Sequence, residues 1–398
     1  MANTLKFGAS EWYGSEGNIL AYNDENGNFK PLPFNFSRGS SATVVNKLGL
    51  IETVQANDAR VEYLNNAKGA LLLEPQRTNL ITYSEQLNND SGWLNQLGST
   101  VIGGQIGVGN SLSAWKLNKG VGTFKSLRFQ SSLSSANYTL SWYLKKGSLD
   151  IAEFRFDGGL GAQFIDFNLS TGVAGTNNDL TNIKIELINN DWYRCQASYN
   201  STITNVHLYI GNSGSTTQEG YVYAQSPQLE EGSYATSYIP TQGTAQTRLA
   251  DSCSQTTPDG VIGQTEGTMY VNVKSDNAEN SGRLIAISDG SPNNRIMIRY
   301  SSNDILIYAQ TTTQQWNYTF SRDENMKIGI AYANNDAVLY LNGVQLNSLT
   351  SFNVPNCSKV FIGTPEDGGS SDTNVKINEF KLYNTRLSNS ELAALTQV

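Results

Sequence analysis

Several residue types that usually signal catalysis, metal binding or crosslinking are scarce in this chain of 398 residues. It has a single histidine, His207, so it lacks the clustered Cys and His residues that bind zinc. The three cysteines are odd in number and far apart, which predicts free thiols at Cys195, Cys253 and Cys357. A Ser–His–Asp triad would have to use His207, and no serine stands in a G-x-S-x-G motif. The sequence therefore predicts a surface or interface histidine and a protein that is not an enzyme.

Charge and long apolar runs are scarce as well. Charged residues make up 16% of the chain, with 27 Lys+Arg against 35 Asp+Glu, and no basic block stands out. This pattern argues against a nucleic-acid partner. No stretch approaches the roughly 18 apolar residues of a membrane span. The N-terminus, MANTLKFGASEWYG, has no apolar run typical of a signal peptide, so we expect neither membrane insertion nor secretion by a standard leader.

Short alternating strands separated by turn residues run through most of the chain and predict an all-β protein. Residues 86–250 read as a jelly-roll β-sandwich. In the segment Asn137–Gly147, for example, four largely apolar residues fall on one face of the predicted strand, and the residues between them fall on the other face. We expect three tryptophans of this region to lie in its core, namely Trp93, Trp142 and Trp192.

A second sandwich is predicted over residues 266–398, after an apolar-poor linker at 251–265. Its best hairpin is KIGIAYANNDAVLYLNGVQL, in which two apolar alternations flank an Asn-Asn-Asp turn and Asn-Gly makes the next turn. Ser388 and Glu391 form a capping box before a short helix. This unbroken series of alternating strands, closed by a capped helix, predicts that residues 266–398 fold alone.

Residues 1–85 are the least regular part, and we interpret them as an attachment region. Three arginines and three glutamates in this region predict a partly buried ionic network that holds irregular segments together. They are Arg38, Arg60, Arg77, Glu52, Glu62 and Glu74.

Three segments carry a resemblance to a known group of proteins. FSRGSSATVVNKLGLIE (36–52), LLLEPQRTNLITYSE (71–85) and QLEEGSYATSYIPTQGTAQTRLAD (228–251) are similar to a framework found in structural proteins of tailed bacteriophages. In those proteins a lectin-like β-sandwich often follows the TSYIPT…TR segment. The run 138–231 resembles the jelly rolls of carbohydrate-binding modules.

The last part of the chain resembles the concanavalin A-like, laminin-G-like sandwich. The residues that carry this likeness are LYLNG (339–343), FIG (361–363) and INEFKLYNTRLSNSEL (377–392). The expected fold is therefore an irregular N-terminal region, a jelly-roll sandwich and a C-terminal concanavalin A-like sandwich. A glycanase of this family would carry grouped carboxylates in an E-x-D-x-x-E pattern, and the sequence has none.

These resemblances imply a virion surface protein, as a fibre, spike or head or tail decoration, that adheres to host surface glycans. It would be made in the bacterial host cytoplasm and carried on the virion exterior. Other virion proteins would bind its N-terminal region, and a homo-oligomer is expected, with a trimer favoured. Two alternatives stay open: a purely structural capsid or tail component without glycan binding, and a polysaccharide depolymerase.

The candidate carbohydrate-binding residues are Tyr308, Gln315, Trp316 and Tyr318. Sugar faces stack on aromatic rings, while amide side chains pair with hydroxyl groups. The alternative is that Trp316 and Tyr318 face the core of the sandwich, because they alternate with Phe320.

A calcium site is the one cofactor that the family resemblance raises. Asp289, Asn293 and Asn294 offer carboxylate and amide oxygens within one turn. Ordinary turn chemistry is the alternative explanation for these three residues.

Overall fold

The computed structural model describes most of the chain and divides it into two compact units. The described residues are 5–8, 13–14, 19–23, 29–88, 92–96, 98–189, 191–214, 218–257, 259–275, 281–301, 304–309, 312–316, 324–367 and 373–398. Unit 1 consists of residues 1–47, 53–76 and 249–398, and unit 2 of residues 48–52 and 77–248. Unit 2 is thus inserted into the sequence of unit 1.

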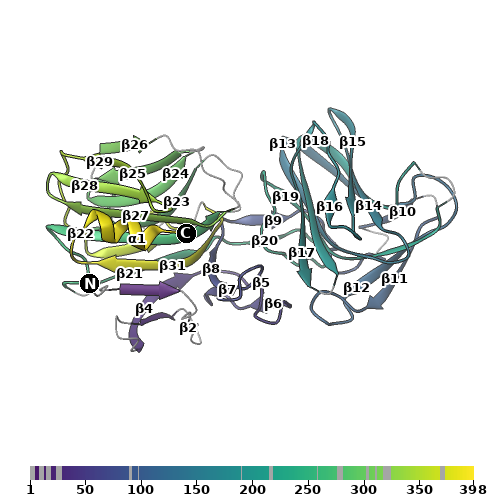
Figure 1. Cartoon of the computed structure of the whole chain (residues 1–398). Coiled ribbons are helices and arrows are strands. Elements are labelled where there is room, and N and C mark those ends of the chain that lie inside the picture. The colour runs from purple at the N-terminus through teal and green to yellow at the C-terminus, as the bar shows by residue number, and fades with distance from the viewer. Residues whose placement is uncertain are drawn as a thin grey trace. The chain divides into compact units, whose positions relative to one another are not determined.

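Unit 1 is built from strands and one short helix (Figure 1). Its elements are β1 Leu5–Gly8, β2 Tyr13–Gly14, β3 Ile19–Asn23, β4 Phe29–Ser37, β5 Ala42–Val45, β7 Arg60–Glu62, β8 Ala70–Leu73, β21 Ser252–Thr256, β22 Glu266–Ser275, β23 Ser281–Ser288, β24 Arg295–Ser301, β25 Asp304–Ala309, β26 Thr312–Trp316, β27 Met326–Ala333, β28 Asp336–Leu341, β29 Val344–Leu349, β30 Lys359–Ile362, β31 Val375–Tyr383 and α1 Asn389–Thr396. The boundary between the units passes through β6, Ile51–Val54.

The strands of unit 1 pair in one continuous antiparallel order that forms both layers of a sandwich. One layer runs β29–β28–β27–β22–β31, and the other runs β4–β21–β30–β23–β24–β25–β26. The free edge of β31 pairs with β1 along one half and with β8 along the other. Strands β1, β3 and β4 are themselves paired in series, so they link the layers.

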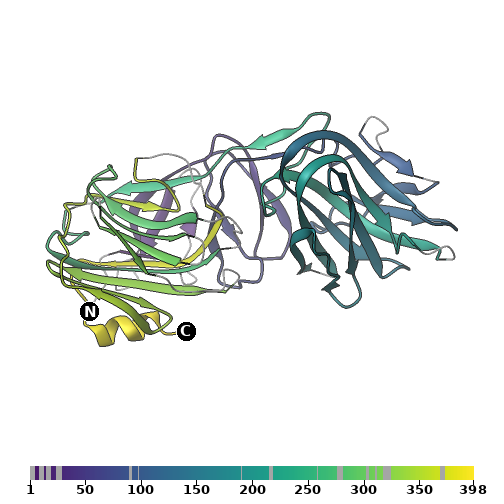
Figure 2. The ribbon, with the colours of Figure 1, turned by 90° about the horizontal axis from the view of Figure 1, so that it is seen from above.

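The core of unit 1 follows from the alternation within its strands. Met269, Val271 and Val273 of β22 point inward and are fully buried, while Asn272 and Lys274, which alternate with the last two of these, are only partly buried. Leu392 of helix α1 packs against Ala331 of β27 and Val338 of β28. Figure 2 shows the helix lying on the outer side of these strands. The predicted hairpin is confirmed as β27–β28, and so is the capping box that begins α1.

The N-terminal strands are structural members of this sandwich. Phe34 and Phe36 of β4 and Leu71 and Leu73 of β8 are fully buried in its core. Residues 251–265, expected as a linker, contribute β21, which pairs with β4 on one side and β30 on the other. The structure thus differs from the expected bounds. The β21–β4 pairing joins residues more than 200 positions apart and the β21–β30 pairing joins residues more than 100 apart, and local sequence patterns carry no signal for either.

Unit 2 is a separate antiparallel β-sandwich. Its strands are β9 Arg77–Asn79, β10 Leu94–Gln96, β11 Thr100–Gln105, β12 Ala114–Lys119, β13 Ser126–Lys146, β14 Ile151–Gly158, β15 Gly161–Asn168, β16 Val173–Ala174, β17 Leu180–Asn189, β18 Trp192–Ile210, β19 Gly220–Glu231 and β20 Gln246–Arg248. The order of its main sheet is β11–β12–β19–β13–β18–β14–β15–β16, with β10 beside β13 and β17 beside β18.

Two long strands organise unit 2. Strands β13 and β18 pair over almost their whole length, with register shifts between Gln130 and Ala136. The second half of β13 pairs with β19, whereas the second half of β18 pairs with β14. The core prediction for the tryptophans is confirmed, because Trp93, Trp142 and Trp192 are each at most 2% exposed.

An ionic cluster inside unit 1 is almost completely buried. The Asp251 carboxylate accepts from Arg38 at 3.1 Å and from Arg60 at 2.5 Å, and Arg60 also binds Glu74 at 2.6 Å. The expected Arg–Glu network is thus present in part, as the Arg60–Glu74 pair, but Asp251 was not among the residues expected in it. Glu62 was expected to join arginines, and instead its carboxylate accepts the backbone N–H groups of residues 64 and 45.

The structure also bears on the predictions for the three cysteines and for membrane-spanning segments. Cys195, Cys253 and Cys357 are buried free thiols, as predicted. Within the described ranges, no helix has the length and apolar character to cross a membrane.

We expect the isolated fragment 266–398 not to fold cooperatively, although its sequence pattern had indicated that it would. The fragment lacks β1, β8 and β21, so the edges of β31 and β30 are unpaired and the core loses the Phe and Leu side chains of β4 and β8. The control is unit 1 with residues 77–248 replaced by a short Gly/Ser linker, since Asp251 N–H already bonds to Glu74 O at 3.0 Å. Circular dichroism melting compares the two, and an equally sharp transition in the fragment would contradict this expectation.

Asp251→Asn should destabilise unit 1 by about 3–5 kcal/mol, because it removes the charge of a buried carboxylate that is paired with two buried guanidinium groups. The matched control is Asp336→Asn. Asp336 also binds an arginine, Arg386, at 2.7 Å, but its side chain is 51% exposed. Its loss should cost less than about 1 kcal/mol. Urea unfolding of both variants gives the comparison, and similar costs would show that the buried cluster has no special weight.

Candidate functional site

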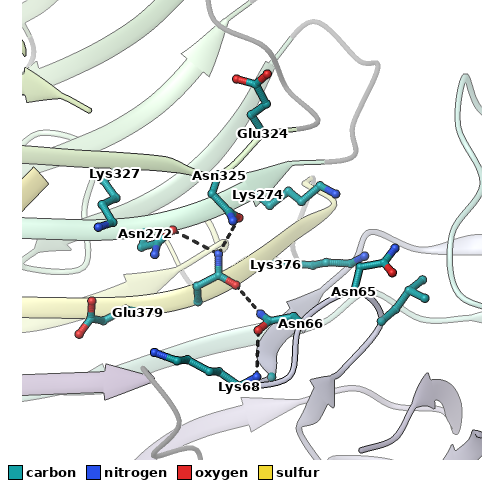
Figure 3. Close-up of a pocket in the computed structure, with 13 residues that line it drawn as sticks. Asn65, Asn66, Lys68, Asn272, Lys274, Glu324, Asn325, Lys327, Lys376 and Glu379 are labelled. Carbon is teal, nitrogen blue, oxygen red and sulfur yellow. Dashed lines mark hydrogen bonds between the residues drawn. The ribbon is translucent and has the colours of Figure 1, made fainter. Parts of the chain in front are cut away.

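Unit 1 contains a polar pocket of about 590 Å³ on the outer face of strands β22, β27 and β31 (Figure 3). That volume lies within the range of about 300–1,000 Å³ typical of small-molecule sites. The described residues that line it are mostly asparagines and lysines, and none is aromatic. They are Leu64, Asn65, Asn66, Lys68, Gly69, Asn272, Lys274, Glu324, Asn325, Lys327, Lys376, Asn378 and Glu379.

A β-bulge in β31 forms the floor of this pocket. Asn272 of β22 pairs with Glu379, but the next residue, Val273, pairs with Ile377, so Asn378 is the additional residue. Ile377 and Phe380 on either side are fully buried. The bulge therefore places two successive polar side chains, those of Asn378 and Glu379, on the outer face.

The loop 64–69 between β7 and β8 forms one wall. Asn65 adopts a left-handed conformation (φ 54°), which asparagine tolerates better than most residues. Gly69 also has a positive φ, and a Cβ atom there would lie 2.7 Å from a side-chain carbon of Val61. The buried carboxylate of Glu62 accepts the Leu64 N–H at 2.9 Å. These constraints hold Asn66 in place over β31.

Four asparagines form a hydrogen-bonded network centred on Asn378. The Asn66 amide nitrogen donates to Asn378 Oδ1 at 2.8 Å. The Asn378 amide nitrogen donates to Asn272 Oδ1 at 3.2 Å and to Asn325 Oδ1 at 2.9 Å. Figure 3 shows these contacts converging on one side chain.

A backbone group fixes the direction of every bond in this network. The Lys68 N–H can only donate, and it donates to Asn66 Oδ1 at 3.1 Å. Asn66 must therefore turn its amide nitrogen to Asn378, which in turn gives its own nitrogen to Asn272 and Asn325. In the described part of the chain, no protein group accepts from the NH₂ groups of Asn272 and Asn325.

Several charged groups surround the network. Lys274 and Lys376 are direct cross-strand partners on β22 and β31. Lys327 donates to the carbonyl oxygen of Gln397 at 2.6 Å. The Glu379 carboxylate is paired with Lys381 at 2.8 Å.

The sequence-predicted carbohydrate residues lie on other strands. Tyr308 is on β25, in register with Thr313 and Met297. Gln315 and Trp316 are at the end of β26. Tyr318 lies outside the described residues. The described residues that line the asparagine pocket do not include Tyr308, Gln315 or Trp316, and the aromatic group stays a separate prediction.

The predicted calcium residues form a compact turn between β23 and β24. Asp289 Oδ1 accepts the Ser291 N–H, and its Oδ2 accepts the amide nitrogen of Asn294, both at 2.8 Å. These bonds lower the pKa of the exposed Asp289 carboxyl, with the Asn294 contact as the largest cause. The Asn293 N–H donates to Ser291 Oγ at 3.3 Å. Throughout the residues described, no group of three or more His, Cys, Asp and Glu side chains is placed to hold a metal ion.

Sequence reasoning missed the pocket because it searched for aromatic clusters. A signal was present in the alternation: β22 ends in V-N-V-K and β31 begins V-K-I-N. These two segments place Asn and Lys on one face of adjacent strands. That they are adjacent, and that Asn66 joins them, is a property of the tertiary structure alone.

The single histidine is buried in unit 2, and the prediction of a surface or interface position is wrong. His207 is 6% exposed; its Nε2 lies 3.1 Å from Asp157 Oδ2 and its Nδ1 lies 3.2 Å from Ser126 Oγ. Its ring stacks on Tyr209. The Arg155 guanidinium binds both Asp157 and the Tyr209 hydroxyl. These side chains cover the sheet face on which His207 lies, which the alternation of the sequence had suggested was exposed to solvent.

This Ser–His–Asp contact does not form a nucleophilic triad. Ser126 is fully buried and has no access to a substrate. The neutral ring donates from Nε2 to Asp157 and accepts at Nδ1, the reverse of the arrangement in serine hydrolases. Burial lowers the pKa of His207 to about 4, although the Asp157 carboxylate opposes this effect. The His207 ring is therefore neutral at neutral pH, and its contacts with Ser126 and Asp157 are structural.

We expect His207 to lose its stabilising effect as the pH falls from about 6.5 towards 4. In that window the unfolded chain binds a proton at this residue and the folded chain does not, so protons favour unfolding. The stability difference between wild type and His207→Gln should shrink by about 1–2 kcal/mol between pH 7 and pH 5. Urea unfolding of both proteins at pH 7 and at pH 5 measures this change in the stability difference. Subtracting the two free energies of unfolding cancels the contribution of groups whose stabilising effect instead grows as the pH falls. Glu153 is one such group, because burial and the neighbouring Asp166 raise its pKa. A difference that is constant with pH would contradict the prediction.

Comparison with known protein families gives one match. Residues 250–393 match the model of a family described as the concanavalin A-like lectin/glucanases superfamily. No curated protein sequence matches the chain.

Several solved structures are similar to part of the chain. A sialidase CBM40 of Ruminococcus gnavus bound to α2,3-sialyllactose is 15% identical, with a TM-score of 0.31, over 34% of this chain and 84% of that one. Domain 4 of a GH43 extracellular arabinanase from Geobacillus stearothermophilus, in complex with arabinotriose, is 17% identical, with a TM-score of 0.31, over 42% and 83%. A SAP-like pentraxin of Limulus polyphemus is 10% identical, with a TM-score of 0.28, over 33% and 70%. The family match shows that this all-β chain contains a concanavalin A-like lectin/glucanase domain.

Proposed function

We propose that this chain is a non-enzymatic glycan-binding protein and that the asparagine pocket of unit 1 holds the sugar. The observation that carries this proposal is the hydrogen-bonded network on Asn378, which leaves the NH₂ groups of Asn272 and Asn325 for a ligand. Amide groups fixed in this way bind sugar hydroxyls without an entropic cost for ordering the side chains.

The lectin-like domain supports glycan binding in general. Three of the four network residues, Asn272, Asn325 and Asn378, lie within the matched range 250–393. The fourth, Asn66, comes from the N-terminal part of unit 1. The proposed site therefore needs the whole of unit 1.

We further propose that the protein is carried on the exterior of a bacteriophage virion, as a fibre, spike or decoration, and binds host surface glycans. The support is the resemblance of segments 36–52, 71–85 and 228–251 to structural proteins of tailed bacteriophages. In this proposal the N-terminal region also contacts other virion proteins, and the protein forms a homotrimer. Electron microscopy of virions labelled with an antibody to this chain tests the location. Virions without label would refute it.

The two alternatives give different results in simple assays. A purely structural component would bind no glycan on an array presented to the full chain. A polysaccharide depolymerase would release reducing sugar from host capsule. Glycan binding without sugar release is the outcome expected here.

The double variant Asn272→Ala/Asn325→Ala should bind the glycans found on such an array at least about tenfold more weakly than the wild type, since two hydrogen bonds of about 1 kcal/mol each are lost. Isothermal titration calorimetry measures the affinities. The control is Asn353→Ala, an exposed asparagine of unit 1 that lies outside the pocket. Unchanged melting temperatures establish that the variants are folded.

A further variant, Trp316→Ala, separates this pocket from the aromatic group predicted from the sequence. If glycan binding is retained in the asparagine double variant but lost in a stably folded Trp316→Ala, the pocket assignment is refuted and the aromatic group takes its place.

A further inference from the structure

The outer face of unit 2 contains two carboxyl groups that lie opposite each other on adjacent strands. Glu153 of β14 and Asp166 of β15 are cross-strand partners. Phe154, Ile165 and Phe167, which precede or follow them, are buried in the core of unit 2, so both carboxyl groups lie on the other face of the sheet. Glu153 is 5% exposed, whereas Asp166 is only partly buried. Two negative charges in such positions destabilise a sheet.

The two carboxyl groups are hydrogen-bonded to each other. An ionised carboxylate only accepts hydrogen bonds, so a bond between two carboxyl groups requires a proton on one of them. Ser213 donates from its hydroxyl and its backbone N–H to the Glu153 carboxyl group. Glu153 Oε1 is nevertheless shielded from solvent and receives no bond from an N–H or O–H group in the ranges that the structure describes. A proton held between Glu153 and Asp166 satisfies this buried oxygen.

The charges around Glu153 favour a proton over a metal ion. Lys119 of β12 is near enough to attract the Glu153 carboxylate, and its Nζ donates to the carbonyl oxygen of Asn212 at 2.9 Å. With one proton on the carboxyl pair, the pair and the Lys119 ammonium group together have no net charge. A divalent cation would instead be repelled by that ammonium group. Among the described residues, no group of three or more His, Cys, Asp and Glu side chains is placed to hold a metal ion.

The neighbouring titratable groups keep their charge state near neutral pH. Tyr209 of β18 is the partner of Glu153 on its other side, and burial raises the pKa of its hydroxyl. Burial lowers the pKa of His207 to about 4. Burial also acts to raise the pKa of Asp157, but its contacts with Arg155 and His207 outweigh this effect and lower it. The charged or titratable groups further along this face are Lys125, Arg128, Arg155, Asp157 and His207.

Ser213 connects the carboxyl pair to the loop 211–214, which follows β18. The Gly211 N–H donates to the carbonyl oxygen of Ile151 on β14 at 2.9 Å, and the Ser213 carbonyl oxygen accepts the N–H of Phe124 at 3.0 Å. Phe124 has a positive φ of 58°, a strained conformation that persists only where its surroundings hold it. The loop thus joins β14, at the carboxyl pair, to the chain that leads into β13.

We propose that a proton shared by Glu153 and Asp166 holds the loop 211–214 on the outer face of unit 2, and that the loop is released as the pH rises above neutral. When the proton passes to solvent, two ionised carboxylates face each other and one of them is buried. A buried carboxylate without a partner of opposite charge is unstable, so Glu153 moves towards water and its bonds with Ser213 break. This pH-sensitive contact lies in unit 2 and is independent of the proposed glycan pocket.

The direction of the pH dependence follows from the environment of Glu153. Burial first, and then the hydrogen bond with Asp166, raise the pKa of Glu153 from 4.5 to about 7. Between these two pH values the closed loop keeps a proton that the open loop releases, so protons favour the closed loop. The stabilising effect is therefore complete below about pH 4.5 and is lost as the pH rises through about 7.

Hydrogen exchange of the full chain measures the opening of the loop through the amides of Gly211 and Phe124, after correction for the intrinsic effect of pH on exchange. The opening constant of the wild type should be at least about tenfold larger at pH 8 than at pH 5. Glu153→Gln carries an NH₂ group where the acid carries its proton, so its opening constant should be equal at both pH values and match the wild type at pH 5. The control is Glu231→Gln, an exposed glutamate of unit 2, which should behave as the wild type.

Asp166→Asn is a second variant in case Glu153→Gln does not fold. Its amide can donate to an ionised Glu153, so most of the pH dependence should disappear, and a dependence that persists overturns the shared proton. Equal opening constants of the wild type at pH 5 and pH 8 overturn the proposal as well. So does faster exchange in Glu153→Gln than in the wild type at pH 5. Calcium chloride that protects the loop of the wild type at pH 8, but not that of Glu153→Gln, would show a cation site in place of the shared proton.

Discussion

The carboxylate of Asp251, held between two buried guanidinium groups, is the interaction on which unit 1 depends. Its oxygens bind Arg38 and Arg60, and it also accepts the backbone N–H of Glu74 at 2.8 Å. Residues 74 and 251 flank the inserted unit in the sequence, so this contact fixes the points where the chain leaves and re-enters unit 1. A carboxylate removed from water in this way needs both arginines, because neither ion is stable there alone.

The proposed site is connected to this cluster through one hairpin. Arg60 belongs to β7, which pairs with β8, and the loop 64–69 joins the two strands. Strand β8 pairs with β31 beside the bulge at Asn378. Asn66 therefore reaches the network because Asp251 fixes Arg60 and Arg60 fixes the hairpin.

Burial decides the role of ionisable groups in both units. In unit 2, Ser126, His207 and Asp157 have the residue types of a catalytic triad, and their lack of access to substrate makes them a structural contact. In unit 1, by contrast, Lys274 and Lys376 are only partly buried and line the polar pocket.

Part of the site was accessible from the sequence. The alternation of Asn272 with Lys274, and of Lys376 with Asn378, is visible in the residues themselves, and it identifies the polar faces of two strands. The contribution of Asn66 was not accessible, because it lies 312 positions from Asn378 and no local pattern links them. The bulge that places Asn378 and Glu379 in succession on the outer face depends on the register between two strands, which also has no local signature.

The sequence by itself determined the all-β class, the hairpin β27–β28, the capping box of α1 and the buried tryptophans. These features depend on alternation, turn residues and charge over short distances, which local physical chemistry specifies. Only the tertiary structure decided that β1, β4 and β8 complete the C-terminal sandwich, that Asp251 closes the ionic cluster, and that four asparagines meet on β31. Those contacts join residues far apart in the chain, and their energy comes from burial and pairing that exist only once both partners are in place.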